Sequence, residues 1–140
     1  MIRKFKTEEL EQVMQLWLSA NLQAHDFIAA DYWHKNYAAV KEALPQAELY
    51  VYCENEQVLG FVGLQDNYLA GIFVAPAYQG KGIGKKLLAQ AKKVRQTLNL
   101  HVYQKNVLAR KFYARQGFTE ISWQEDESTG ETEIQLRWNK

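Results

Sequence analysis

The stretch VAPAYQGKGIGKKLLAQAKK, residues 74–93, decides how this chain folds. Three of its glycines fall within five positions, directly before a segment with helical apolar spacing: Gly80, Gly82 and Gly84. The first N–H groups of a helix have no internal partners and carry partial positive charge, so they attract anions. Glycines let an anion reach that backbone, and the neighbouring lysines add positive charge. The stretch therefore predicts a pyrophosphate-binding loop, with a tight packing turn and solvated lysines as the alternative.

Two familiar phosphate motifs do not fit this loop. A Walker loop, G-x-x-x-x-G-K-[ST], fails because the sixth residue from Gly80 is Lys85, and a G-x-G-x-x-G dinucleotide motif fails at the same lysine. Both motifs also belong to repeating βαβ chains, whereas three antiparallel-type strand patterns precede this loop. The sequence therefore excludes the P-loop and dinucleotide-binding classes.

The rest of the chain predicts strands and helices around the loop. The spacing of apolar and turn residues indicates strands at 2–6, 48–54, 58–65, 68–75, 99–104, 118–125 and 132–138. It indicates a first helix that starts near residue 8 and a second that ends near Pro45. Two further helices are indicated over about 82–98 and 106–116. This order predicts one domain, residues 1–140, of the mixed α/β or α+β class, with a mostly antiparallel sheet of about seven strands and about four helices. One parallel crossover runs through the long helix.

The composition limits which kinds of binding partner are expected. The 140 residues are 47% hydrophobic and carry a net charge of +1, which argues against nucleic-acid binding through bulk charge. Cys53 is the only cysteine and is expected in the core, and His25, His34 and His101 do not have metal-ligand spacing. No apolar run suggests a signal or a membrane segment. We expect a cytoplasmic monomer or homodimer without metal, nucleic-acid or membrane partners.

Two motifs in order resemble the GNAT superfamily of N-acetyltransferases. QGKGIG, residues 79–84, follows the strand end IFVAP and matches Q/R-x-x-G-x-G/A, the acyl-CoA loop of that family. NVLARKFYARQGF, residues 106–118, resembles its second signature. The resemblance is specific over residues 58–118, approximately, and outside that range it extends only to the order of strands and helices. The segment VYQKN, which leads into the second motif, resembles the small single-domain bacterial members of the family, several of which act on protein amines.

The resemblance implies acetyl-CoA as cosubstrate and a set of residues that hold it. Backbone N–H groups would bind the pyrophosphate from Gln79, Gly80, Lys81, Gly82, Ile83, Gly84 and Lys85. The pantetheine arm would run between strands 68–75 and 99–104, with main-chain partners at Phe73 and Val74. Asn106 would contact the pantetheine or the sulfur, and its position also predicts a helix N-cap.

The resemblance makes Tyr113 the acid that protonates the departing CoA thiolate, with a core tyrosine as the alternative. A thiol titrates near about 8.5 and a phenol near about 10, so this transfer is only mildly uphill. The strand YLAGIFVA lacks the glutamate that many relatives carry as base. In some bacterial protein N-terminal acetyltransferases of the family a glutamate on the next strand is the acceptor, and His101 stands at that place, so the resemblance makes His101 our predicted base. A neutral imidazole is a reasonable base at pH 7. Alternatively, His101 is an ordinary strand residue without a catalytic role. The proton acceptor is then a water chain, His25 or Asp66.

The expected function is acetyl transfer from acetyl-CoA to a primary amine of a protein, either lysine or an N-terminus, by direct attack. A small-molecule amine acetyltransferase and a non-catalytic acyl-CoA sensor are the alternatives. The acceptor depends on residues 20–45 and on the last hairpin, which the motifs do not cover. There His25 and His34 are interpreted as surface residues. The acidic hairpin cluster is interpreted as solvated or as attracting a cationic amine: Glu125, Asp126, Glu127 and Glu131.

Overall fold

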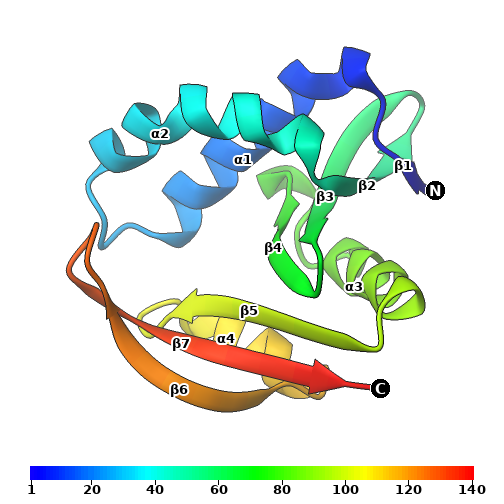
Figure 1. Ribbon diagram of the computed structural model, residues 1–140. Helices are drawn as coiled ribbons and strands as arrows, with labels where there is room; N and C mark the ends of the chain where they lie inside the picture. The colour runs from blue at the N-terminus through cyan, green and yellow to red at the C-terminus, as the bar shows by residue number, and fades with distance from the viewer.

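A computed structural model describes residues 1–140 and shows one seven-stranded sheet flanked by helices (Figure 1). The strands lie in the order β1-β2-β3-β4-β5-β7-β6, and every neighbouring pair is antiparallel except β4 and β5. The strands are β1 (Ile2–Lys4), β2 (Glu48–Glu54), β3 (Gln57–Gln65), β4 (Tyr68–Val74), β5 (Thr97–Tyr103), β6 (Thr119–Asp126) and β7 (Glu131–Asn139). The α-helices are α1 (Leu10–Ala24), α2 (Ala30–Ala43), α3 (Ile83–Val94) and α4 (Val107–Arg115). The predicted α+β fold and its parallel crossover are confirmed.

The helices cover the two faces of the sheet and create two cores. Residues of α3 and α4 pack on one face, in a cluster that includes Leu87, Leu98 and Tyr113. Residues of α1 and α2 pack on the other face, in a cluster that includes Trp17 and the buried Cys53. No helix is both long enough and apolar enough to span a bilayer.

The long helix ends earlier than its apolar spacing predicts. We expected it to continue to Leu98, but α3 stops at Val94 and Leu98 belongs to β5. Leu98 fits the helical spacing of α3 only by chance. It is buried as part of a strand alternation, since Leu98, Leu100 and Val102 of β5 all face the core beneath α3 and α4. Residues at positions 99, 101 and 103 consequently face the α1 and α2 side of the sheet.

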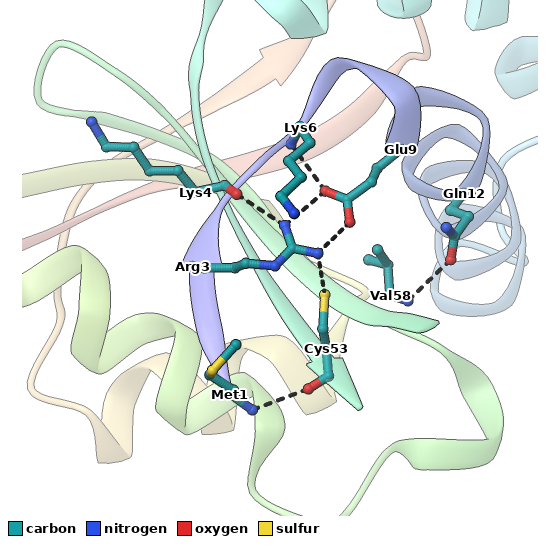
Figure 2. Close-up of polar contacts among 8 residues, drawn as sticks. All are labelled: Met1, Arg3, Lys4, Lys6, Glu9, Gln12, Cys53 and Val58. Atoms are coloured by element: carbon teal, nitrogen blue, oxygen red, sulfur yellow. Dashed lines mark hydrogen bonds and ion pairs between the residues drawn. The ribbon is translucent and has the colours of Figure 1, made fainter. Parts of the chain in front are cut away.

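A polar cluster fixes the start of α1 on the sheet (Figure 2). Arg3 of β1 donates from Nη1 to Oε1 of the buried Glu9 at 3.0 Å, and from Nη2 to Sγ of Cys53 at 3.3 Å. The hydrogen bond from Arg3 is the largest cause of the lowered pKa of Glu9. One turn on, Oε1 of Gln12 accepts the N–H of Val58 in β3 at 3.0 Å. These contacts hold α1 in a defined position, which in turn positions its far end.

The sheet is nearly open between its two parallel strands. Only Tyr68 of β4 and Asn99 of β5 are paired, and the N–H of Asn99 donates to the carbonyl of Asn67 at 2.8 Å. Beyond that pair the strands diverge, and Figure 1 shows β5, β7 and β6 set apart from β1–β4. Main-chain groups along the inner edge of β4 are therefore left without a neighbouring strand.

Candidate active site

A cavity of about 790 Å³ lies in the seam between β4 and β5. Its lining comes from β4, β5 and β7, from both ends of the α1–α2 connection, and from α4. A second hollow of about 360 Å³ adjoins the glycine loop, and the two share Val74, Gln79, Gly84 and Phe112. The loop and the seam therefore form one continuous site.

We call one side of this site the loop wall: residues 79–85 and the main chain of β4. Within it, Gly80 and Gly82 have φ values of +78° and +83°, which side-chain-bearing residues rarely adopt. A Cβ at either position would meet nothing within 4 Å, so these glycines do not serve packing. A Cβ at Gly84 would make only an ordinary contact, 3.8 Å from the Phe112 ring. The packing-turn alternative therefore does not explain the loop.

The loop wall presents a run of free backbone donors. Helix α3 starts at Ile83, and its N-cap, Gly82, has no side chain to cap it. No hydrogen bond engages the N–H groups of residues 80–85, and the first one made is from Lys86 to the carbonyl of Gly82 at 3.1 Å. Such a cradle at a helix N-terminus fits a phosphate group.

Gln79 contributes to the loop wall through its side chain. Its backbone N–H is already directed at the carbonyl of Pro76, at 3.4 Å. Its Nε2 donates to the carbonyl of Val74 at 3.0 Å and to Oε1 of Gln23 at 2.9 Å. Gln79 therefore braces the end of β4 against α1, which keeps the loop in place.

The register of β4 decides which of its main-chain groups face the seam. The N–H of Ala75 donates to the carbonyl of Leu59 at 2.8 Å, and partners in an antiparallel ladder alternate. The main chain of Phe73 therefore faces β3, whereas that of Ile72 and Val74 faces the seam. Phe73 is therefore out of register for the main-chain contact that we predicted, and the main chain of Ile72 faces the seam beside that of Val74.

Asn106 joins the start of α4 to the end of α1. Its Oδ1 accepts the N–H of Ala109 at 3.3 Å, which is the N-cap of α4 that its position predicts. Its Nδ2 lies 3.3 Å from Nε2 of His25, at the end of α1. Because the amide nitrogen can only donate, the imidazole accepts at Nε2 and carries its proton on Nδ1.

His25 is not the surface residue that the sequence suggested. Its ring stacks on Trp33, with centroids 5.1 Å apart, and meets Phe27 and Tyr103 edge-on. Burial lowers its pKa to about 4, partly opposed by the backbone of Asn21, and Nδ1 has no hydrogen-bond partner. His25 is therefore a neutral, cavity-lining acceptor, whereas His34 is exposed as expected.

Tyr113 lies at the floor of the cavity, two turns along α4 from Asn106. Its side chain is 8% exposed, packs edge-on against Phe112 and Phe118, and makes no hydrogen bond within the protein. Burial, and then the nearby Tyr68, raise the pKa of its hydroxyl. The phenol is thus held in its protonated form beside the seam.

The opposite side of the site is built from side chains, and we call it the side-chain wall: His25, Tyr68, His101, Tyr103 and Glu133. His101 is exposed on β5 opposite Gln135 of β7, and its Nδ1 lies 2.8 Å from the Tyr68 hydroxyl. Burial, and then the carboxylate of Glu133, raise the pKa of Tyr68. Glu133 is paired with Tyr103 across the β5–β7 ladder and lines the cavity.

Two of the four residues of the acidic hairpin cluster are engaged by other groups of the protein. Asp126 accepts the hydroxyl of Tyr103 at 2.5 Å and that of Ser128 at 2.6 Å, and Glu131 pairs with Lys105 at 3.1 Å. Glu133, which the sequence analysis passed over, lines the cavity, as does Asp26 of the α1–α2 connection. Asp66, an alternative base in the sequence analysis, is exposed and does not line the cavity.

Comparison with known proteins identifies the family. The sequence model of the Acetyltransferase (GNAT) domain matches residues 45–120, which is more than half of the chain. The chain belongs to the GNAT acetyltransferases. It is 38% identical to the peptidyl-lysine N-acetyltransferase YiaC of Escherichia coli K12 over 130 residues, covering 90% of this chain and 89% of YiaC.

Two further GNAT relatives have solved structures. Peptidyl-lysine N-acetyltransferase YjaB of Escherichia coli K12 is 31% identical over 84% of this chain and 80% of its own. The solution structure of apo YjaB superimposes with a TM-score of 0.87 at 28% identity, covering 99% and 96% of the two chains. A Bacillus anthracis protein solved with acetyl coenzyme A superimposes with a TM-score of 0.61 at 26% identity, over 67% and 63%. The protein is an acetyl-CoA-dependent N-acetyltransferase.

Proposed function

We propose that this GNAT enzyme acetylates lysine side chains of proteins, with Tyr113 as the acid and His101 as the proton acceptor. The observation that carries the proposal is the continuous site between the two walls. Six free backbone N–H groups lie at one end, and Glu133 with exposed His101 lies at the other. YiaC and YjaB, which are peptidyl-lysine N-acetyltransferases, support the same acceptor class.

The cosubstrate fits the loop wall by its chemistry. Its pyrophosphate would accept hydrogen bonds from the N–H groups of residues 80–85, and the amides of its pantetheine arm would pair with the main chain of Ile72 and Val74. A main-chain N–H of this edge can also donate to the acetyl oxygen, where negative charge develops on attack. The main chain of Phe73 faces β3 and is not available to the cosubstrate.

If the acetyl group goes to a lysine, the enzyme needs a base that takes up a proton from the lysine ammonium group. Deprotonating a free lysine at pH 7 costs about 4.6 kcal/mol, because its pKa lies near about 10.4, whereas an α-amine costs about 1 kcal/mol. His101 is available for this step, since it is exposed and its ring is oriented by Tyr68. Glu133 would attract the ammonium group toward the same place.

The test is an amine panel run on the wild type, His101→Gln and His101→Glu. We expect the wild type to prefer lysine peptides over N-terminal amines and over small polyamines. His101→Gln should lower kcat/KM for lysine and flatten its rise with pH, while His101→Glu should retain part of the activity. A wild type that acetylates only small amines would contradict the acceptor, and one that binds acetyl-CoA without turnover would indicate a sensor. An unchanged rate and pH profile in His101→Gln would remove His101 from the mechanism.

A further inference from the structure

The hydrogen bond between Tyr68 and His101 restricts what His101 can do. The Tyr68 hydroxyl lies 2.8 Å from Nδ1, and the rings are 5.5 Å apart. An imidazole can accept a proton only at a nitrogen with a free lone pair. When the Tyr68 hydroxyl donates to Nδ1, that lone pair is occupied, so a proton reaches Nδ1 through the oxygen of Tyr68.

Tyr68 stands where the two substrates must meet. It is the β4 residue of the single β4–β5 pair, so its ring marks the point from which the seam opens. It lines the same cavity as Tyr113 and Glu133. The side chain is 38% exposed, so an incoming amine can reach it.

We propose that Tyr68 is a further catalytic residue, which accepts the first proton of the substrate ammonium while passing its own hydroxyl proton to Nδ1 of His101. This inference rests on the proposed function for the role of His101. The phenol is well suited to transmit a proton without keeping it, because its raised pKa leaves it neutral before and after the step. Exposed His101 then releases the proton to water.

The protons and bonds balance over the whole reaction. The ammonium has three protons, and the first goes through Tyr68 and His101 to water. The nitrogen attacks the acetyl carbon, the C–N bond forms, the C–S bond breaks, and the thiolate takes the proton of Tyr113. The second ammonium proton leaves the nitrogen as the adduct collapses and restores the Tyr113 phenol. The third remains on the amide.

The test is a double-mutant cycle with Tyr68→Phe, His101→Gln and the double variant. Both residues lie on one proton route, so the two single losses in kcat/KM should agree within about twofold, and the double variant should lose no more. Tyr68→Phe retains the ring, and acetyl-CoA affinity should stay within about twofold in all three variants. Tyr52→Phe is the matched control, because that strand tyrosine donates its hydroxyl to Glu54, away from the cavity, and should leave kcat/KM unchanged.

A second readout separates proton transfer from simple ring positioning. A peptide whose lysine is replaced by S-aminoethylcysteine has a more acidic ammonium, so it should partly rescue both single variants relative to the wild type. Independent, multiplicative losses or a missing rescue would overturn the relay, as would Tyr68→Phe with wild-type kcat/KM. The cycle is run on whichever amine the wild type turns over. Failure of the lysine peptide therefore counts against the proposed acceptor, and absence of any turnover counts against both.

Discussion

The two walls of the seam are built from different parts of the chain. The loop wall consists of backbone groups from one stretch of the chain, which runs from β4 through the glycine loop into the first turn of α3. The side-chain wall gathers five residues from the end of α1 and from three strands, β4, β5 and β7. A site made of backbone requires glycines and a fixed register, whereas a site made of side chains requires only that the fold bring them together.

The first prediction concerns Tyr113, which comes from α4 and lines the cavity. Tyr113→Phe keeps the ring and its contacts with Phe112 and Phe118 but removes the proton. We expect kcat to fall about 100-fold, the usual scale for one positioned acid, with acetyl-CoA affinity unchanged. Single-turnover rates should be measured beside steady-state rates, because slow product release can hide part of the effect. A wild-type single-turnover rate would show that the hydroxyl is structural.

The second prediction concerns His25 of the side-chain wall, which is hydrogen-bonded to Asn106 at the start of α4. Its pKa is near 4 in the folded protein and about 6.5 when unfolded, so the unfolded chain takes up the proton first as pH falls. The free energy of unfolding should therefore decrease between pH 6.5 and 4, by on the order of 2 kcal/mol after allowance for partial solvent access. His25→Gln should flatten this slope in urea denaturation series. Equal slopes in both proteins would contradict a buried neutral imidazole.

The third prediction tests the loop wall with a charge. Gly82→Asp places a carboxylate beside the free N–H groups, and we expect acetyl-CoA affinity to fall at least about tenfold, or about 1.4 kcal/mol. Any side chain is strained at the φ of +83°, so Gly82→Asn serves as a control of similar size that tolerates this backbone. Calorimetry on folded protein should show a smaller loss for asparagine than for aspartate. Equal losses would mean that backbone strain, and not charge, governs the loop.

The same contrast explains what could be predicted from the sequence. The order of strands and helices followed from apolar spacing, and the loop followed from its glycines, because each is a local property. The end of α3 was missed because Leu98 fits a helical spacing and a strand alternation equally well. Of the side-chain wall, His101 was predicted, whereas Tyr68 and Glu133 were missed because they stand on strands far apart in the chain and no short motif contains both. If the register between β4 and β5 were known from the sequence, it would have placed Tyr68 near His101. The spacing of apolar residues along the two strands does not determine that register.

The single pair that joins β4 to β5 has a consequence for the protein before it binds acetyl-CoA. A sheet edge with unpaired N–H and C=O groups is a template for aggregation, and proteins normally cover such edges. Here the unpaired edge lies inside the sheet, where its neighbours leave room for a thin chain bearing amides rather than for another strand. The cosubstrate would then act as a missing strand that closes the sheet. Resistance to aggregation and to heat should accordingly increase with acetyl-CoA concentration, as mass action requires for a ligand that binds only the folded state.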